Sequence, residues 1–255
     1  MKNVLYIIAA ILLFTSCKKD ETEVNPVVND YPLAIGDTWE YDVIVDGLIY
    51  DDHSSQVPTD TMYITRNYTE TILADTILHD TLNVKIRQEM IDTVGAYTYL
   101  NTDNQGLKAY AHRFVSGKKS LPIAYFRGLN AAKIQPGNLF YYEPPLLIYQ
   151  TPMQEGDHWV YVDNDFNRIE KTVVGKEQVI AAGRTFDCFK ISLKYYMNDT
   201  IENTLTKTQW VASAGLIKET TTYNRIALSY ASGEEAYMDG MEVKLLTNFD
   251  LNQRP

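Results

Sequence analysis

The chain alternates apolar and polar residues over long stretches that follow position 31. In TWEYDVIVD (38–46), Trp39, Tyr41, Val43 and Val45 fall on one face, and the residues between them are mostly polar. Because successive side chains of a β-strand point to opposite faces, this period of two predicts a strand with one buried face.

The stretches LNVKIRQEM (82–90), DCFKISLKYY (187–196) and MEVKLLTNF (241–249) repeat this period. In each, we expect the apolar set to face the core and the polar set to face solvent. The residues expected inward are Leu82, Val84, Ile86 and Met90, then Phe189, Ile191, Leu193 and Tyr195, then Met241, Val243, Leu245 and Phe249. The residues expected outward in the first stretch are Asn83, Lys85, Arg87 and Glu89.

Clusters of Asn, Asp and Gly lie between the alternating stretches. NTDNQG (101–106), VDNDFN (162–167) and MNDT (197–200) have the composition of hairpin turns. We identify no amphipathic helical period beyond the first residues of the chain. The sequence therefore predicts an all-β protein with an antiparallel sheet body, either a sandwich or a half-open barrel.

One motif occurs twice, as PLAIGDTWEY (32–41) and PMQEGDHWVY (152–161). Gly gives the backbone freedom at a turn, Asp can bond its own backbone there, and a strand follows. The Trp and Tyr are two residues apart and so share a face, which predicts Trp39, Tyr41, Trp159 and Tyr161 as core anchors. We interpret the duplication as two halves, about 31–120 and 153–250, of one domain spanning 31–255. The alternative is a pair of aromatic platforms for sugar rings.

The segment 121–152 is apolar and aromatic, has no steady period and contains several prolines. Such a segment is typical of a connection that crosses over the core. The alternative is a lip over a ligand pocket. The aromatic residues of that lip would be Tyr125, Phe126, Tyr141, Tyr142 and Tyr149.

The first residues predict export. A charged start precedes the apolar run VLYIIAAILLF (4–14), which is too short for a membrane span. The sequence LFTSC that ends at Cys17 resembles the lipobox of bacterial lipoproteins, although Phe14 departs from the commonest form. The resemblance implies a signal peptide at 1–16 and a lipid such as palmitate on Cys17. An ordinary signal with an incidental Cys is the alternative.

Residues 17–30 are polar, contain proline and predict a flexible tether. The residues CKKDETE (17–23) resemble the signal that sends lipoproteins of some Gram-negative bacteria to the outer face of the outer membrane. This implies a cell-surface location in preference to the periplasmic face. The alternative is a solvated tether with charges for solubility.

The amino-acid composition argues against one class of binding partner. The net charge of −10 argues against nucleic acid, because its binders need a basic patch. The chain has two Cys, and Cys17 is assigned to lipid. Cys188 is then unpaired, and we expect it to be a small buried hydrophobe.

The stretches VIAAGRTFDCFKIS (179–192) and TQWVASAGLIKETTTYN (208–224) resemble a family of exported β-rich proteins of unknown function. The resemblance implies an antiparallel barrel-like or sandwich body on an exported protein, and it supplies no catalytic residues. The matching positions are Gly183, Phe186, Cys188, Trp210, Gly215, Leu216 and Lys218.

Motifs of enzymes and metal sites are faint. The histidines His53, His79, His112 and His158 are scattered, and no nucleophile elbow or phosphate loop is present. DDH (51–53) is typical of a solvated loop. Asp163, Asp165 and Asn167 have calcium-loop spacing, but Arg168 and Val174 occupy the places of the required Gly and acid. The sequence therefore predicts no metal and no cofactor.

Three functions follow from these observations. The first is a non-enzymatic envelope lipoprotein that binds a glycan, a lipid or a partner protein. The second is a structural or accessory envelope lipoprotein without a small ligand. The third is a hydrolase, since the 33 acidic residues leave open a carboxylate pair formed in space.

Overall fold

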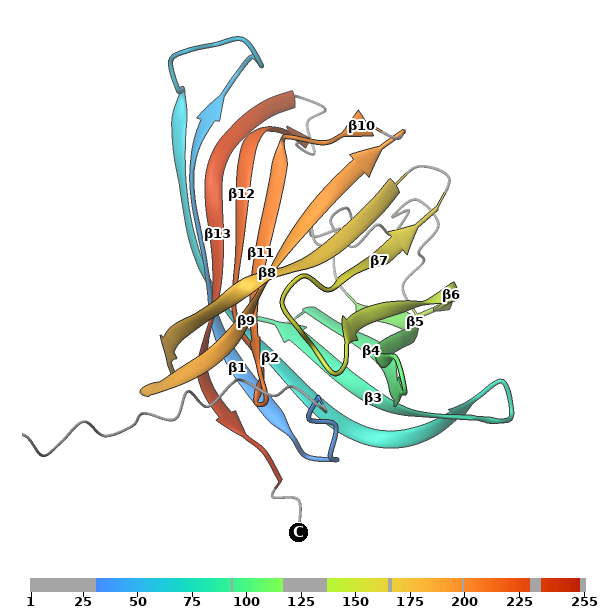
Figure 1. Cartoon of the computed structure of the whole chain (residues 1–255). Coiled ribbons are helices and arrows are strands. Elements are labelled where there is room, and N and C mark those ends of the chain that lie inside the picture. The colour runs from blue at the N-terminus through green and yellow to red at the C-terminus, as the bar shows by residue number, and fades with distance from the viewer. Residues whose placement is uncertain are drawn as a thin grey trace, which may run out of the picture.

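The computed structural model describes residues 31–92, 94–116, 137–164, 167–198, 200–229 and 235–252. These residues form one antiparallel sheet of 13 strands that curls into a barrel (Figure 1). The first strands are β1 (Thr38–Tyr50), β2 (Asp60–Leu78), β3 (Leu82–Ile91), β4 (Val94–Asp103), β5 (Gly106–Ser116) and β6 (Leu139–Gln150). The others are β7 (His158–Asp163), β8 (Asn167–Ala181), β9 (Arg184–Met197), β10 (Thr200–Ile201), β11 (Leu205–Ala212), β12 (Gly215–Ser229) and β13 (Glu235–Asp250). The all-β prediction is confirmed, and the sandwich alternative is wrong, because a single sheet encloses the core.

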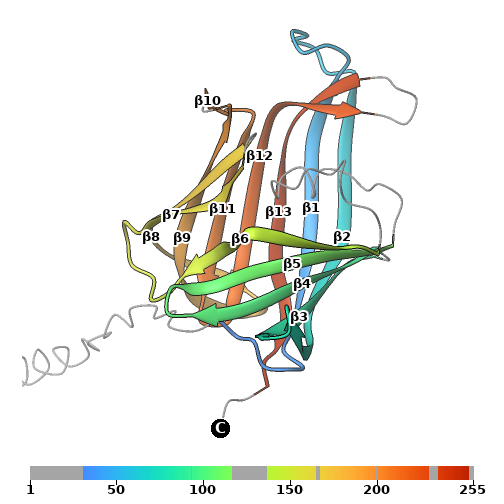
Figure 2. The same cartoon turned by 90° about the vertical axis from the view of Figure 1, so that its right-hand side faces the viewer.

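The sheet is a meander in which the first and last strands of the chain lie side by side. β1 pairs with β13 from Thr38 opposite Asp250 to Tyr50 opposite Tyr237. Neighbours then follow the chain on both sides, from β1 to β6 and from β13 back to β7. Figure 2 shows β1, β2, β12 and β13 standing as a tall wall beside the lower belt of β3 to β6.

The barrel has a seam where β6 and β7 meet. The strand ladder of the described residues ends at these two strands, so hydrogen-bonded pairing does not continue across them. Two side chains span the seam instead. Trp159 Nε1 donates to Leu147 O at 3.0 Å, and Lys171 Nζ donates to Ile148 O at 3.0 Å.

The repeated motif forms the same turn twice. Gly36 and Gly156 have φ of 91° and 89°, a left-handed conformation that glycine adopts at little cost. The carboxylates of Asp37 and Asp157 each accept a backbone N–H three residues earlier, at 2.7 Å. The next strand in each half, β2 or β8, then donates one backbone N–H to the Asp carbonyl at 2.9 Å.

The floor of the barrel is apolar and aromatic. Trp39 is fully buried, and its Nε1 donates to Ala214 O at 2.7 Å. Gly215 leaves room for it, since a Cβ there would be 3.1 Å from Trp39 Nε1 and 3.2 Å from the Tyr31 hydroxyl. A second, smaller cluster around Val84, Tyr99 and Ala111 lies on the opposite face of β3 to β5.

Two strands have the expected face inward and two do not. The apolar set from Trp39 to Val45 and the set from Phe189 to Tyr195 face the interior, as predicted. In β13, however, Met241, Val243 and Leu245 lie opposite the outward residues of β1, so the inward face predicted for them is wrong, although Leu245 still packs against the core cluster. A bulge near Leu246 brings Phe249 opposite Trp39, as expected for an inward residue.

In β3 the residues Arg87 and Glu89, expected outside, point inward and are nearly buried. The physical reason is the same as in β13: the middle of this barrel is polar, so the polar set of a strand can be the inner set.

The prediction for segment 121–152 is corrected in part. Its residues 139–150 form edge strand β6, not a connection crossing the core, and residues 121–136 lie outside the described part. Pro144 and Pro145 fit an edge, where no N–H is needed for a second neighbour. The ladder with β5 skips them, because Ala109 pairs with Leu146 and Ala111 with Tyr141.

Candidate functional site

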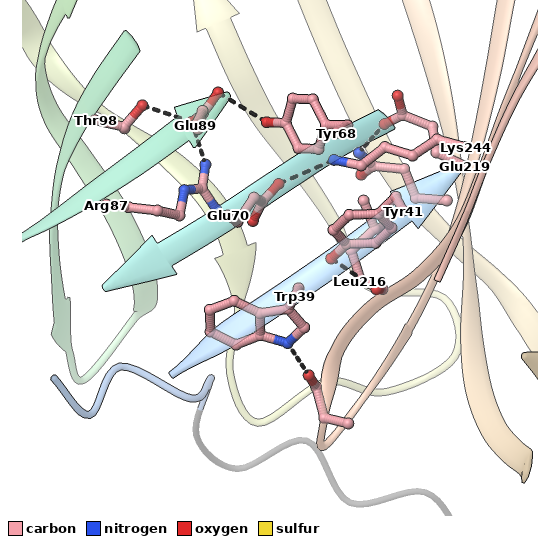
Figure 3. A network of polar contacts seen from close by, with 12 residues as sticks. Trp39, Tyr41, Tyr68, Glu70, Arg87, Glu89, Thr98, Leu216, Glu219 and Lys244 are labelled. Carbon is pink, nitrogen blue, oxygen red and sulfur yellow. Dashed lines mark hydrogen bonds and ion pairs between the residues drawn. The ribbon is translucent and has the colours of Figure 1, made fainter. Parts of the chain in front are cut away.

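A layer of charged side chains crosses the barrel interior above the aromatic floor (Figure 3). Glu70 lies at its centre, on β2, with 4% of its side chain exposed. Lys244 Nζ of β13 is 2.9 Å from Glu70 Oε1, and Arg87 Nη1 of β3 is 3.2 Å from Glu70 Oε2. One carboxylate thus holds two cations from strands on either side of it.

Glu89 extends this layer along β3. Its Oε1 accepts from Arg87 Nη2 at 2.8 Å and from Thr98 Oγ1 at 2.7 Å, and its Oε2 accepts from the Tyr68 hydroxyl at 2.9 Å. Glu89 lies directly opposite Glu70 in the ladder, an arrangement of like charges that is unfavourable by itself. Arg87 removes the repulsion by pairing with both.

Lys244 is held by rings as well as by charge. Its Nζ is 4.1 Å from the ring centroid of Tyr41 and 3.6 Å from that of Tyr68. A cation over an aromatic face gains about 2 kcal/mol or more when it is desolvated. Tyr41 therefore anchors the floor through its ring and supports the ionic layer above it.

A second group of polar residues lies on β11 and β12. Lys207 Nζ is 2.8 Å from Glu219 Oε1, and Gln209 Nε2 donates to Glu219 Oε2 at 2.6 Å. Burial alone would raise the pKa of Glu219, but Lys207 and Lys244 outweigh it and lower that pKa to about 2. Glu219 is therefore ionised at neutral pH.

Lys171 joins this group to the seam. Its Nζ donates to Gln209 Oε1 at 3.1 Å and to Ile148 O, and lies 4.8 and 4.3 Å from the ring centroids of Tyr149 and Tyr161. No carboxylate of the described residues lies within ion-pair distance of it. Burial lowers the pKa of Lys171 to about 7, although Glu219 opposes the change.

The carboxyl groups of the interior have pKa values that are shifted in opposite directions. Burial would raise the pKa of Glu70, yet Arg87 and Lys244 bring it below its usual value. Burial does raise the pKa of Glu242, whose Oε2 accepts from the Tyr223 hydroxyl at 3.2 Å. A carboxyl acid catalyst needs a raised pKa and a partner of different protonation at a reacting bond. Glu70 lacks the raised pKa, because Arg87 and Lys244 neutralise it.

The predicted anchors have different surroundings. Trp39, Tyr41 and Trp159 are buried in the core, and Tyr161 packs against it from a half-buried position. Phe186 contacts Phe249 with ring centroids 5.8 Å apart. Trp210 is on the outer side of β11, where its Nε1 donates to Glu177 Oε2 at 3.1 Å and Lys218 covers its ring.

The remaining predicted residues can be placed as follows. Cys188 is free and buried, and burial raises the pKa of its thiol to about 12, which makes it a poor nucleophile. Of the expected lip, Tyr149 is buried inside the barrel, Tyr142 packs against the core and Tyr141 is exposed. These three do not form one lip. Tyr125, Phe126 and the lipidation residue Cys17 lie outside the described residues.

Sequence reasoning missed the ionic layer. Glu70, Arg87, Glu219 and Lys244 carry no motif, and the pair of Lys244 and Glu70 joins residues 174 positions apart. A usable signal was the charge at alternate positions of β3 (Lys85, Arg87 and Glu89) and of β13 (Glu242 and Lys244), which a solvated face would also produce.

Neither a metal site nor a membrane-spanning helix is found among the described residues. No group of three or more His, Cys, Asp and Glu in those residues could hold a metal ion. Within the same part of the chain, no helix has the length and apolar character needed to cross a membrane.

No protein-family model matches the chain, and no curated protein matches it. A structure described as a lipoprotein from Parabacteroides distasonis is similar at 10% identity and a TM-score of 0.36, covering 86% of this chain and 97% of that one. A structure described as an exported protein with a YmcC-like fold, from Bacteroides fragilis, is similar at 10% identity and a TM-score of 0.32, covering 88% and 99%. At these TM-scores neither carries an argument about function.

Proposed function

We propose that the protein is a non-enzymatic, lipid-anchored binding protein of the bacterial envelope, and that the upper interior of its barrel is the binding compartment. The supporting observation is the ionic layer inside the barrel. Buried ion pairs are often no more stabilising than apolar residues of the same size, so a barrel that only had to fold would gain little from this one. Departures from an apolar core are expected where a protein binds something.

The degree of exposure inside the barrel supports this. Glu70 and Glu89 are 4% exposed, whereas Lys207 on β11 and Glu219 on β12 are 16% and 14% exposed. Val43, Val45 and Ile64 face the interior and are half-buried, although Ile49 and Met238, nearer the rim, are buried. Water therefore reaches some of the inward-facing side chains beside and above the ionic layer, as a ligand would need to.

The anchor part of the proposal rests on the lipobox at Cys17. The described domain begins at the floor, where Asn252 N donates to Asp37 Oδ1 at 2.8 Å and joins the two ends of the body. A tether that leaves from Tyr31 would hold this floor toward the membrane and the opposite end away from it. Display on the cell surface, indicated by CKKDETE, is part of the same proposal.

The binding part is tested by native mass spectrometry of the protein released from membranes. Val45→Trp would fill the upper interior, and the control Ile44→Trp adds the same ring on the outer face of β1. We expect a non-covalent small molecule on the wild type and on the control, and its loss from Val45→Trp with the melting temperature retained. A bare wild-type protein that also gives no thermal shift with fatty acids, oligosaccharides or envelope extracts would contradict the proposal.

The anchor part is tested separately. Cys17→Ala removes the only thiol that a lipobox at this place could modify. We expect the variant to leave the membrane fraction, and we expect the mass of the wild-type N-terminal peptide to include acyl chains. Full retention of Cys17→Ala in the membrane fraction would contradict the anchor.

A further inference from the structure

Arg66 is the feature of the interior that the ionic layer does not use. It lies on β2, where Tyr68 pairs with Tyr41 and Arg66 pairs with Val43. Tyr41 and Tyr68 are buried inside the barrel, and Met62 on the same face packs against the core. Since alternate residues of a strand share a face, Arg66 points inward as well.

The Arg66 guanidinium has no partner among the described residues. It forms no hydrogen bond, ion pair or ring contact with them, and the side chain is half-buried, so solvent still reaches it. A guanidinium carries five N–H donors in a planar fork that matches a carboxylate or a phosphate. An inward-facing fork without an acceptor is suited to an acceptor brought by a ligand.

The carboxylates near Arg66 are engaged elsewhere. Along the row of paired residues that contains Arg66 and Val43, the next charges are Lys244 and then Glu219. Lys244 is bound to Glu70, and Glu219 is bound to Lys207 and Gln209. Glu242, one row higher, is held by Tyr223. A ligand anion at Arg66 would therefore meet a guanidinium that no described carboxylate offsets, with the pair of Lys244 and Glu70 about two strand spacings away, roughly 10 Å.

The wall above Arg66 is apolar on one side. The inward residues of β1 and β2 above this row are Val45, Gly47, Ile49, Ile64 and Met62. At the heights of Val45 and Gly47, β12 and β13 present Glu242, Thr221 and Tyr223, and at the height of Ile49 they present Met238 and Ile226. Arg66 is six positions from the end of β2 at Asp60, which is about 20 Å of strand. Val45, Ile64 and Met62 are half-buried, so an apolar chain that starts at the guanidinium could contact them.

We propose that Arg66 binds the acidic head group of an amphiphile, a carboxylate or a phosphate, whose apolar chain lies along the β1–β2 side of the inner wall. This rests on the proposed function, since it names the ligand class of the same compartment. Charge complementarity selects this occupant: a neutral sugar would offer the fork only uncharged acceptors, and a cation would be repelled by Arg66.

The test is isothermal titration calorimetry at low and at physiological salt, with a chain that starts at residue 17, carries Cys17→Ser and keeps every described residue. The probes are dodecanoate, dodecyl phosphate, dodecanol and dodecyltrimethylammonium, each below its micelle concentration. The variants are Arg66→Gln, Arg66→Lys and the control Lys194→Gln. Lys194 is exposed on the outer face of β9, between the inward residues Leu193 and Tyr195, so the control makes the same change of charge outside the barrel.

We expect the wild type and Lys194→Gln to bind one or both anionic probes, with dodecanol weaker and no binding of the ammonium probe. Arg66→Gln should weaken anion binding about ten- to a hundred-fold, because a charge-assisted hydrogen bond is lost. Arg66→Lys should recover part of the affinity. The preference between dodecanoate and dodecyl phosphate tells which acid the fork accepts. Because Arg66 has no partner among the described residues, its variants should melt with the wild type.

Two results would overturn the inference while leaving the proposed function intact. One is equal binding of dodecanol and dodecanoate with no effect of Arg66→Gln. The other is a native ligand found by mass spectrometry that is neutral or cationic. A wild type that binds no probe and carries no native ligand would overturn both.

Discussion

The two halves of the barrel begin alike and then diverge at one position. In the first half Glu70 of β2 lies opposite Trp39, and in the second half Lys171 of β8 lies opposite Trp159. Both positions follow the same Gly-Asp turn, and both strands have a bulge just beyond, between Ile72 and Ala74 or between Val173 and Gly175. The same backbone thus carries an acid in one half and a base in the other.

The surroundings of the two charges differ more than the charges themselves. Glu70 has Arg87 and Lys244 within ion-pair distance, and its pKa is lowered. Lys171 has the apolar Leu193 opposite it on β9, and burial lowers its pKa to about 7. A buried charge is stable when partners compensate for lost water, and otherwise it tends to become neutral. Glu70 in the first half is ionised, whereas Lys171 in the second half is close to losing its proton at neutral pH.

The largest effect should come from removing the acid of the first half. Glu70→Gln leaves Arg87 and Lys244 with one carboxylate fewer, and breaking a buried pair costs about 3–5 kcal/mol. Urea unfolding at pH 7 measures this loss of stability. The control is the exposed Glu40→Gln, whose free energy of unfolding should be within about 0.5 kcal/mol of the wild type. A loss below about 1 kcal/mol would mean that Glu70 does not hold the layer together.

The next largest effect should be a dependence of the free energy of unfolding on pH that is caused by Lys171. Its pKa is about 7 when folded and about 10.4 when unfolded, so between these values the unfolded state binds more protons and stability rises with pH. We expect Lys171 to contribute about 2 kcal/mol of added stability between pH 7 and pH 9.

Lys171→Met should remove this increment. The measurement is the free energy of unfolding of both proteins at pH 7, 8 and 9. The informative quantity is the difference between the two proteins in how steeply this free energy changes with pH, because the contributions of all other titratable groups are the same in both. Parallel curves for the two proteins would contradict a depressed pKa at Lys171.

The two tryptophans allow a smaller test. Trp39→Phe removes the donor to Ala214 O at the floor, and Trp159→Phe removes the donor to Leu147 O across the seam. Each change leaves a carbonyl oxygen without its hydrogen-bond donor, which should lower the free energy of unfolding by about 1–3 kcal/mol. We expect the seam variant, in addition, to speed amide exchange in β6 and β7 without altering β1 and β13. Equal exchange in all four strands would contradict a weak seam.

The repeated turn should give the smallest difference. Asp37 is buried and its carboxylate also accepts from Asn252 N, whereas Asp157 is half-buried and serves only its own turn among the described contacts. Asp37→Asn should therefore cost about 1–2 kcal/mol and Asp157→Asn about half as much, because hydrogen bonds to charged groups are the stronger ones. Melting temperatures of the two variants suffice, and the reverse order would contradict the structural assignment.

The sequence could predict the strands and their turns because these are local. Trp39 and Tyr41 face inward as expected, since the period of two and ring size both favour it. The faces of β3 and β13 could not be predicted, because the partner of Lys244 is Glu70, which is 174 residues away. Pattern reasoning places a charge in solvent unless its partner is known, and no local signal reveals that partner.

The site was predictable only in outline. The expected aromatic lip at Tyr141, Tyr142 and Tyr149 is divided among a buried, a packed and an exposed position, because these residues lie on a twisted edge strand with a gap in its ladder. Arg66 could be read from the sequence only as a polar residue near the start of a strand. What makes it notable is the absence of a partner among the described residues, and that is a property of the assembled barrel.

The pairing of β1 with β13 has a consequence for how the chain acquires its fold. The first and last strands of the described domain are neighbours, so the contacts that join the two halves of the sheet have the greatest separation in sequence that the domain allows, and folds of this kind form slowly. A chain is synthesised from its N-terminus, so β1 and β2 are made well before β13. Until β13 follows, β1 presents an unpaired edge, and Glu70 has no lysine beside it. The arrival of the last strand therefore joins the halves of the sheet and supplies Lys244 to the ionic layer in one step, which links successful folding to completion of the chain.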